Sequence, residues 1–168
     1  MKKEKRYENY PAWMVATTVV FSLLTYFLGA YIIYQLGLAW LAAYIVYILW
    51  LEFRLMTHCT NCYYYGKYCA SGRGKLACLF FKKGKKKFGN MKLTWTSLVP
   101  DMLVSVIPIV IGIWLLINRF DWAIVGAIVV LFLLMSAGNA VLHGSIICKY
   151  CKQRQLGCPA ERLFDKRK

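Results

Sequence analysis

The chain has 168 residues, of which 60% are hydrophobic and 16% aromatic, and its formal net charge is +15. One soluble domain of this length cannot bury so much apolar surface, so the excess must face lipid. The composition excludes an ordinary soluble protein, and the distribution of the basic residues explains the charge better than a nucleic acid partner does.

Four apolar stretches are long enough, or nearly so, to cross a bilayer, which takes roughly 20 residues. In chain order they cover residues 12–36, 38–51 running on towards 56, 98–117 and 122–142. The second is the shortest, and it leaves Glu52 and Arg54 at a membrane boundary. Tight joints at 35–37 and 118–121 connect the stretches into two hairpins, over 12–56 and 98–143. We predict an all-α, polytopic membrane protein with four transmembrane helices.

Lysine and arginine fall on one side of this topology. Of the 22 basic residues, all but Arg119 lie in the N-terminal lead-in, the central loop with its flanking ends, or the C-terminal tail. The positive-inside rule therefore puts both termini and the central loop in the cytoplasm. The first apolar run is longer than a signal-peptide core and no small-residue cleavage site follows it, so we expect it to remain as a helix of the cytoplasmic membrane.

Single residues inside the apolar stretches carry further expectations. Tyr44 and Tyr47 lie deep enough to need a hydrogen-bond partner from another helix or from a ligand. Pro100 is predicted in the first turn of the third helix, where proline costs little, with Asp101 at the positive end of the helix dipole. Pro108 is deeper and is expected to kink that helix.

Ionisable and amide side chains gather at one depth, near the cytoplasmic ends of the helices. Groups of this kind inside a membrane boundary usually face a bundle interior or a water-filled cavity. The layer has two interpretations, a structural network of ion pairs or a catalytic site. Its members are Glu52, Arg54, His58, Asp101, Asn139 and His143.

A basic segment at 79–92 reads LFFKKGKKKFGNMK, with phenylalanines bracketing a lysine run. This pattern predicts a segment lying on the anionic inner leaflet, where each cation adds about 1 kcal/mol of attraction. The same basic face suits an acidic cytoplasmic redox partner. The candidate residues for binding anions or the lipid surface are Arg73, Lys75, Lys82, Lys83, Lys85, Lys86 and Lys87.

A three-cysteine pattern, C-x2-C-x6-C, occurs twice at an offset of 89 positions. The first copy is Cys59, Cys62 and Cys69, and the second is Cys148, Cys151 and Cys158. The same offset relates Pro11 to Pro100 and Gly37 to Gly126. We predict two tandem repeats. The first, 1–92, holds a hairpin, a cysteine cluster at 58–78 and the basic segment, and the second, 93–168, holds a hairpin, a cluster at 148–158 and a basic tail. Because each repeat has two spans, the repeats are parallel and any pseudo-symmetry axis runs along the membrane normal.

Cytoplasmic cysteines are ordinarily reduced, which points to metal binding, with palmitoylation, disulfides and inert thiols as the other interpretations. A C-x2-C pair brings two thiolates to one metal, and a third cysteine can return to it after a turn. The sequence fits either iron-sulfur clusters or zinc, including one zinc ion shared by both C-x2-C pairs. The candidate ligands are Cys59, Cys62, Cys69, Cys78, Cys148, Cys151 and Cys158, with His143 as a further candidate.

Three functional hypotheses follow for a membrane protein with a small cytoplasmic, cysteine-rich metal-binding cap. The first is electron transfer between a cytoplasmic donor and a membrane-soluble carrier through iron-sulfur clusters. The second is a zinc-stabilised structural, transport-accessory or assembly protein without redox activity. The third is an enzyme acting on a lipid or amphiphile at the inner face, with the polar layer as its site. The sequence does not decide whether the chain is an enzyme, and it is compatible with an oligomer.

Overall fold

The computed structural model describes residues 6–85, 88–90 and 94–159, and within them it is helical, with no strand. Three long helices are α1 (Ala12–Tyr34), α2 (Leu38–Cys59) and α4 (Trp95–Asn118). The fourth helical stretch is α5 (Trp122–Leu133), η2 (Leu134–Gly138), α6 (Asn139–Val141) and η3 (Leu142–Ile147), in which η2 and η3 are π-helical turns. The short elements are α3 (Arg73–Phe80), η1 (Phe88–Asn90) and α7 (Lys152–Gln155).

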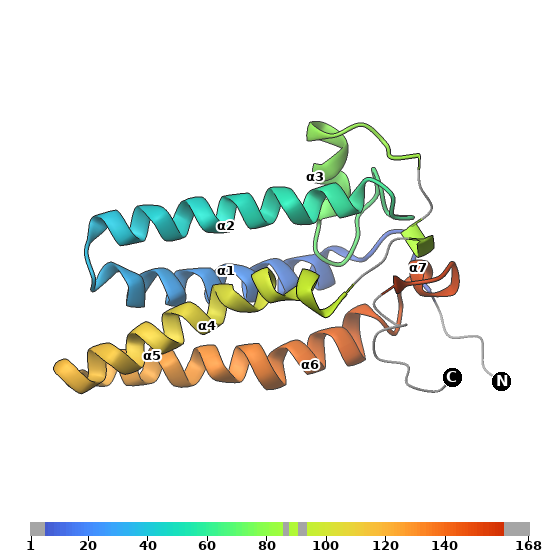
Figure 1. The fold of residues 1–168 in the computed structure, drawn as a ribbon. Coiled ribbons are helices and arrows are strands. Elements are labelled where there is room, and N and C mark those ends of the chain that lie inside the picture. The colour runs from blue at the N-terminus through green and yellow to red at the C-terminus, as the bar shows by residue number, and fades with distance from the viewer. Residues whose placement is uncertain (1–5, 86–87, 91–93, 160–168) are drawn as a thin grey trace.

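The four long stretches run side by side, and α3 and α7 both lie at one end of the bundle (Figure 1). We call this the cysteine end. Each stretch is long and apolar enough to cross a membrane, and large apolar side chains such as Phe27 and Ile117 are exposed along the outside. The prediction of an all-α protein with four membrane-spanning helices is confirmed at the level of length and composition. Helix α2 extends to Cys59, further than its apolar run indicated.

Helices α1 and α4 make the most extensive contact in the bundle, while α1 also packs against α2 and α5. Near the end opposite the cysteines, the buried core is a cluster of aliphatic side chains from α1, α4 and α5. Its fully or almost fully buried members are Ile32, Leu115, Ile124, Ala127 and Leu131. Burial of such side chains stabilises the packing by roughly 25 cal/mol for each Å² of apolar surface removed from contact with solvent water, and in lipid close packing replaces that contribution.

The prediction that Pro100 lies in the first turn of its helix is wrong. Thr94 and Ser97 form a capping box, in which the Thr94 N–H donates to the Ser97 hydroxyl at 3.1 Å, and the helix therefore begins at Trp95. Pro100 is consequently in the second turn. Asp101 lies beyond the first turn, where the helix dipole no longer stabilises a carboxylate appreciably.

Two tyrosines of α2 donate hydrogen bonds to backbone carbonyls of α4, and one of them binds a carbonyl that Pro108 leaves free. Pro108 has no N–H, so the carbonyl of Val104, four residues earlier, loses its helical partner. The Tyr44 hydroxyl donates to that carbonyl at 2.8 Å, and the Tyr47 hydroxyl donates to the Pro100 carbonyl at 2.7 Å. We expected both tyrosines to need a hydrogen-bond partner, and backbone carbonyls of α4 provide it.

Tyr44 reaches α4 by passing over Gly29 of α1. A Cβ at Gly29 would clash with the Tyr44 hydroxyl and would lie 3.1 Å from the Pro108 ring. We expect Gly29→Ala to lower the free energy of unfolding in detergent by about 1–3 kcal/mol, because either the tyrosine or the backbone must move. Gly126→Ala is the matched control, since its Cβ would meet no atom within 4 Å, and it should be neutral or slightly stabilising. Equal melting shifts for the two variants would contradict this packing.

Candidate metal centre

The segment 6–10 and the two cysteine loops, 59–72 and 148–158, meet at the cysteine end. Tyr10, Met14, Tyr64 and Ala70 form a buried cluster there, and Cys62, Cys69 and Cys151 pack against it. The Tyr10 hydroxyl donates to the Ile147 carbonyl at 2.7 Å, and the Tyr64 hydroxyl donates to the Tyr7 carbonyl at the same distance. Cysteines from both loops therefore share one apolar, aromatic environment.

The two loops exchange a pair of hydrogen bonds. The Tyr63 N–H donates to the side-chain oxygen of Gln153 at 2.8 Å, and the Lys152 N–H donates to the Tyr64 hydroxyl at 2.9 Å. Gln153 is buried, and its amide nitrogen donates to the Gly157 carbonyl at 3.2 Å. Positions 63 and 152 are 89 residues apart, as are positions 64 and 153. Under the offset of 89, Tyr63 therefore corresponds to Lys152 and Tyr64 to Gln153. In each loop the first residue of this pair donates its backbone N–H to the side chain of the second residue of the pair in the other loop.

Both C-x2-C segments close with the same backbone hydrogen bond. The Cys62 N–H donates to the Cys59 carbonyl at 3.1 Å, and the Cys151 N–H donates to the Cys148 carbonyl at 3.4 Å. A turn of this kind brings the two cysteines of a C-x2-C pair close together, and C-x2-C is a spacing typical of zinc ligands. Each turn directly follows a membrane-spanning stretch, as the sequence predicted.

Backbone N–H groups point at three of the sulfurs. The Gly74 N–H donates to Cys69 Sγ at 3.2 Å. The N–H of Tyr64 is directed at Cys62, and those of Gln153 and Arg154 at Cys151. Such donors favour the thiolate over the thiol and are a common outer shell of metal-bound cysteines. A Cβ at Gly74 would collide with the Tyr64 carbonyl oxygen, so the approach that makes the Cys69 bond requires glycine.

The pKa of Cys62 is raised to about 11, chiefly by burial and to a smaller extent by the nearby sulfurs of Cys151, Cys69 and Cys158, against the lowering effect of the Tyr64 N–H. Burial also raises the pKa of Cys151, against the effect of its backbone donors. Both groups are therefore neutral thiols at pH 7 without a cation, and a bound metal would ionise them. The Cys62 sulfur is the point where thiols of the two loops come into electrostatic range.

The cysteine thiols and the backbone N–H groups directed at them fit a metal-thiolate centre. Their sulfur atoms, however, do not converge on one point. Among the described residues, no group of three or more Cys, His, Asp or Glu side chains is close enough to hold a metal ion. Binding would require side-chain rotation. Cys78 and Cys148 are exposed, and Cys78 Sγ donates to the Lys75 carbonyl of its own helix at 3.0 Å.

The predicted polar layer contains two hydrogen-bonded groups on α2, which are within electrostatic range of each other through Asp101. Glu52 binds Arg73 of α3 through both oxygens, at 2.8 Å to Nε and 2.6 Å to a terminal nitrogen, and it accepts a hydrogen bond of 2.6 Å from the Tyr26 hydroxyl. Burial would lower the pKa of Arg73, but the contact with Glu52 outweighs burial and raises it. This pair fastens the first cysteine loop to α1 and α2.

The second group joins α2 to α4. A terminal nitrogen of Arg54 donates to the Ser97 carbonyl at 2.9 Å, and the other lies 3.9 Å from Asp101 Oδ1. That oxygen is buried and has no hydrogen-bond partner among the described residues. His58 is within electrostatic range of both Arg54 and Asp101. The remaining two predicted members, Asn139 and His143, are exposed on the fourth helical stretch.

The basic candidates are not equivalent. Arg73 is half-buried on Glu52, and the Lys75 ammonium donates to the Tyr68 hydroxyl at 2.7 Å. Three lysines that follow α3 are exposed: Lys82, Lys83 and Lys85. Lys86 and Lys87 lie outside the described residues.

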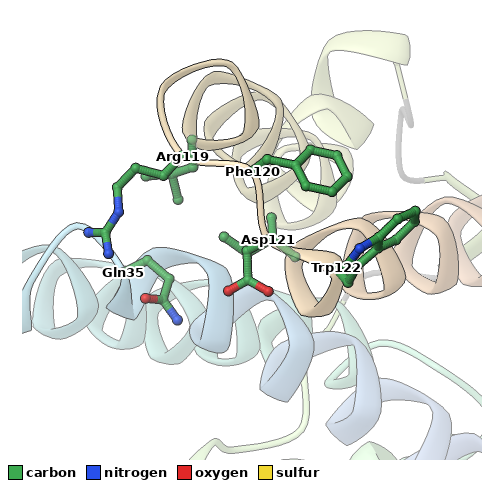
Figure 2. Close-up of a pocket in the computed structure, with 7 residues that line it drawn as sticks. Gln35, Arg119, Phe120, Asp121 and Trp122 are labelled. Atoms are coloured by element: carbon green, nitrogen blue, oxygen red, sulfur yellow. The ribbon is translucent and has the colours of Figure 1, made fainter.

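A pocket of about 310 Å³ lies at the end opposite the cysteines, between the joint of α1 with α2 and the joint of α4 with α5. Figure 2 shows the Arg119 side chain extending towards Gln35, with Phe120 and Trp122 beyond Asp121. Asp121 caps α5 by accepting the Ala123 N–H at 2.8 Å. None of the predicted site residues lines this pocket.

Sequence reasoning did not identify Tyr10, Tyr64 or Gln153 as residues that build the cysteine end. A usable signal was present for two of them, because Tyr64 and Gln153 are equivalent under the offset of 89 and follow the second cysteine of each pattern by two positions. Both are large polar residues next to cysteines that the same offset relates. Tyr10 carries no such signal.

The fold defines the class of this protein: an all-α chain with four helices able to span a membrane, and with cysteine-containing loops at one end. No protein-family model, curated protein or solved structure matches it. Its function must therefore be inferred from the residues of the site.

Proposed function

We propose that this chain is an integral membrane metal-thiolate protein whose centre lies between the two cysteine loops, and that the centre is an iron-sulfur cluster that passes electrons between a cytoplasmic donor and a membrane-soluble carrier. One observation carries the proposal. The partly buried Cys62 packs with Cys69 and Cys151 against one cluster of buried side chains, and its thiol is in electrostatic range of Cys69 in its own loop and of Cys151 and Cys158 in the other. Ligands from both loops would then bind the cluster.

The electrostatics of these thiols favour metal binding over thiol-disulfide catalysis. A catalytic cysteine needs a lowered pKa, because the thiolate is the nucleophile. The raised pKa values of Cys62 and Cys151 make them poor nucleophiles. Their N–H donors nevertheless stabilise negative charge on sulfur once a metal has displaced the protons.

The hydrogen bonds between the loops support the predicted division into repeats of 1–92 and 93–168. The Tyr63 to Gln153 bond and the Lys152 to Tyr64 bond join positions that interchange when the numbering is shifted by 89. Two loops related in this way would present equivalent cysteines to a centre between them. This arrangement favours a shared site over two independent ones.

Position supports the electron-transfer part of the proposal. A bound cluster would supply one-electron chemistry at the cytoplasmic surface, with both termini and both cysteine loops on that side. Tyr7, Tyr10, Tyr64 and Tyr150 pack on one another with neighbouring ring centroids 5.4–5.8 Å apart. Cys62, Cys69 and Cys151 pack against this aromatic cluster. Exposed basic residues of the second cysteine loop, Lys149 and Arg154, would attract an acidic donor.

Zinc is the second candidate. The hydrogen bonds that join the loops mean that any metal at this place would also hold the two halves together, which is the role of structural zinc. The third hypothesis, an enzyme acting on an amphiphile through the polar layer, gains less support. Glu52 is already engaged by Arg73 and Tyr26, and such mutual satisfaction is typical of a structural pair.

Anaerobic purification in mild detergent, with metal analysis and an absorption spectrum on the same sample, tests the proposal. We expect brown protein with near-stoichiometric iron and acid-labile sulfide. Colourless protein with bound zinc would replace electron transfer by the structural role. Protein without either metal, purified from cells supplied with both, would overturn both candidates.

A further inference from the structure

Helix α3 presents an apolar surface to its surroundings. Leu76, Leu79 and Phe80 are 46%, 74% and 61% exposed, while Gly74 and Ala77 are buried on the opposite side of the same helix. Three large apolar side chains on eight residues are far more than scattered surface hydrophobics require. A short helix with one such face is suited to lie in the plane of a membrane interface.

This surface continues the lipid-facing surface of α2. The Phe80 and Phe81 rings pack edge-on against Phe53 of α2, with centroids 5.9 Å and 6.4 Å away. Phe53 is itself 45% exposed, and Leu49 and Trp50, one turn earlier, are also exposed. Figure 1 shows α3 projecting from the side of α2 at the cysteine end. The apolar band of a membrane-spanning helix therefore runs without a break onto α3.

The basic residues that follow α3 indicate that its apolar side contacts an anionic membrane surface. The exposed residues Lys82, Lys83 and Lys85 directly follow the helix, and no aspartate or glutamate occurs between positions 53 and 100. Ammonium groups at the level of an apolar face match the phosphates of anionic lipids, which lie just above the acyl chains. A soluble acidic partner would match the lysines but not the exposed leucines and phenylalanine.

We propose that α3 and residues 81–85 form an interfacial anchor. Leu76, Leu79 and Phe80 enter the inner leaflet, and Lys82, Lys83 and Lys85 bind the head groups of anionic phospholipids. The anchor does not depend on the metal proposal. It does touch the same loop, because the N–H of Gly74, in the first turn of α3, binds the Cys69 sulfur.

Cys78 is a native reporter for this anchor, because it is exposed on α3, about 100° around the helix axis from Leu79, and docking of α3 would bring it to the level of the lipid head groups. The full chain is placed in nanodiscs of phosphatidylcholine, with or without phosphatidylglycerol, and modified with a membrane-impermeant maleimide. Peptide mass spectrometry then gives the rate at Cys78, with the exposed Cys148 as internal control. We expect phosphatidylglycerol to slow modification of Cys78 by on the order of tenfold and to leave Cys148 unchanged.

The matched variant carries Lys82→Gln, Lys83→Gln and Lys85→Gln, all at exposed positions, and its fold is checked by circular dichroism. It should lose the effect of phosphatidylglycerol on Cys78. Equal rates at Cys78 in the two lipids, or an undiminished lipid effect in the variant, would overturn the anchor. Protection of Cys78 by polyglutamate in phosphatidylcholine nanodiscs, without protection by phosphatidylglycerol, would also overturn it and would assign the lysines to an acidic protein partner.

Discussion

Replacing Cys62 with serine should reduce the metal content of the purified protein to roughly a tenth or less of the wild-type value. Cys62 is the thiol in electrostatic range of sulfurs from both loops. Serine keeps the size of the side chain but offers a hydroxyl, which is a poor ligand for iron-sulfur clusters and zinc. Cys151→Ser should have the same effect, because Cys151 is the equivalent residue in the second copy and also has backbone N–H groups directed at its sulfur.

Cys78→Ser is the matched control for these two variants. Cys78 is exposed, and its thiol is bonded to the carbonyl of Lys75 rather than directed at the other cysteines. Metal content should therefore be unchanged. Loss of metal from both Cys78→Ser and Cys62→Ser, together with retention in Cys151→Ser, would shift the centre to the first loop alone, as a four-thiolate site of the first repeat. That result would contradict a centre shared by the two loops.

Removing the charge of Glu52 should produce the largest loss of stability in the chain. Glu52→Gln leaves the guanidinium of Arg73 without its counter-ion in a site where both side chains are less than a quarter exposed. Breaking one partner of a fully buried pair costs about 3–5 kcal/mol, and for this partly exposed pair we expect roughly 2–4 kcal/mol. For a chain of this length that corresponds to a fall in Tm on the order of 10 °C. The fall in Tm is measured by thermal unfolding in detergent, monitored by circular dichroism.

The double variant Glu52→Gln, Arg73→Gln separates a lost ion pair from a general defect. With both charges removed, no uncompensated ion remains, so part of the lost stability should return. Arg54→Gln is a comparison on the same helix. The Arg54 guanidinium lies as far as 3.9 Å from the Asp101 carboxylate. We therefore expect Arg54→Gln to lower the free energy of unfolding by less than Glu52→Gln does. A double variant that is less stable than either single variant would contradict the proposed pairing.

Membrane-spanning helices could be predicted because their signal is local. Each is an uninterrupted apolar run of about the required length, and every residue in it contributes independently of the rest of the chain. The start of α4 was predicted less well, since the Thr94–Ser97 capping box precedes the apolar run. Likewise α2 continues to Cys59, beyond its apolar run, and Glu52 in this extension is paired with Arg73.

The partners of polar side chains could not be predicted from the sequence. Nothing local indicates that Tyr44 binds the Val104 carbonyl, 60 positions away, although Pro108 does imply that this carbonyl needs a donor. Glu52 and Arg73 were assigned to different candidate sites, a polar layer and an anion-binding surface, yet they form one ion pair. Asn139 and His143 shared a predicted depth with Glu52 but are exposed on the fourth helical stretch. Depth along a helix is set by the sequence, whereas the direction of a side chain also depends on how the helices rotate against one another.

By itself, the sequence determined the four spans, the two cysteine patterns and their common offset, because hydropathy and spacing are properties of the linear chain. Only the tertiary structure decided which thiols approach each other. It brings Cys62 towards the second loop through the paired bonds of Tyr63 with Gln153 and of Lys152 with Tyr64, and it leaves Cys78 on the outer face of α3. The physical reason is that a short loop closes on contacts supplied by distant segments, and the gain from those contacts, not the spacing of the cysteines, selects its conformation.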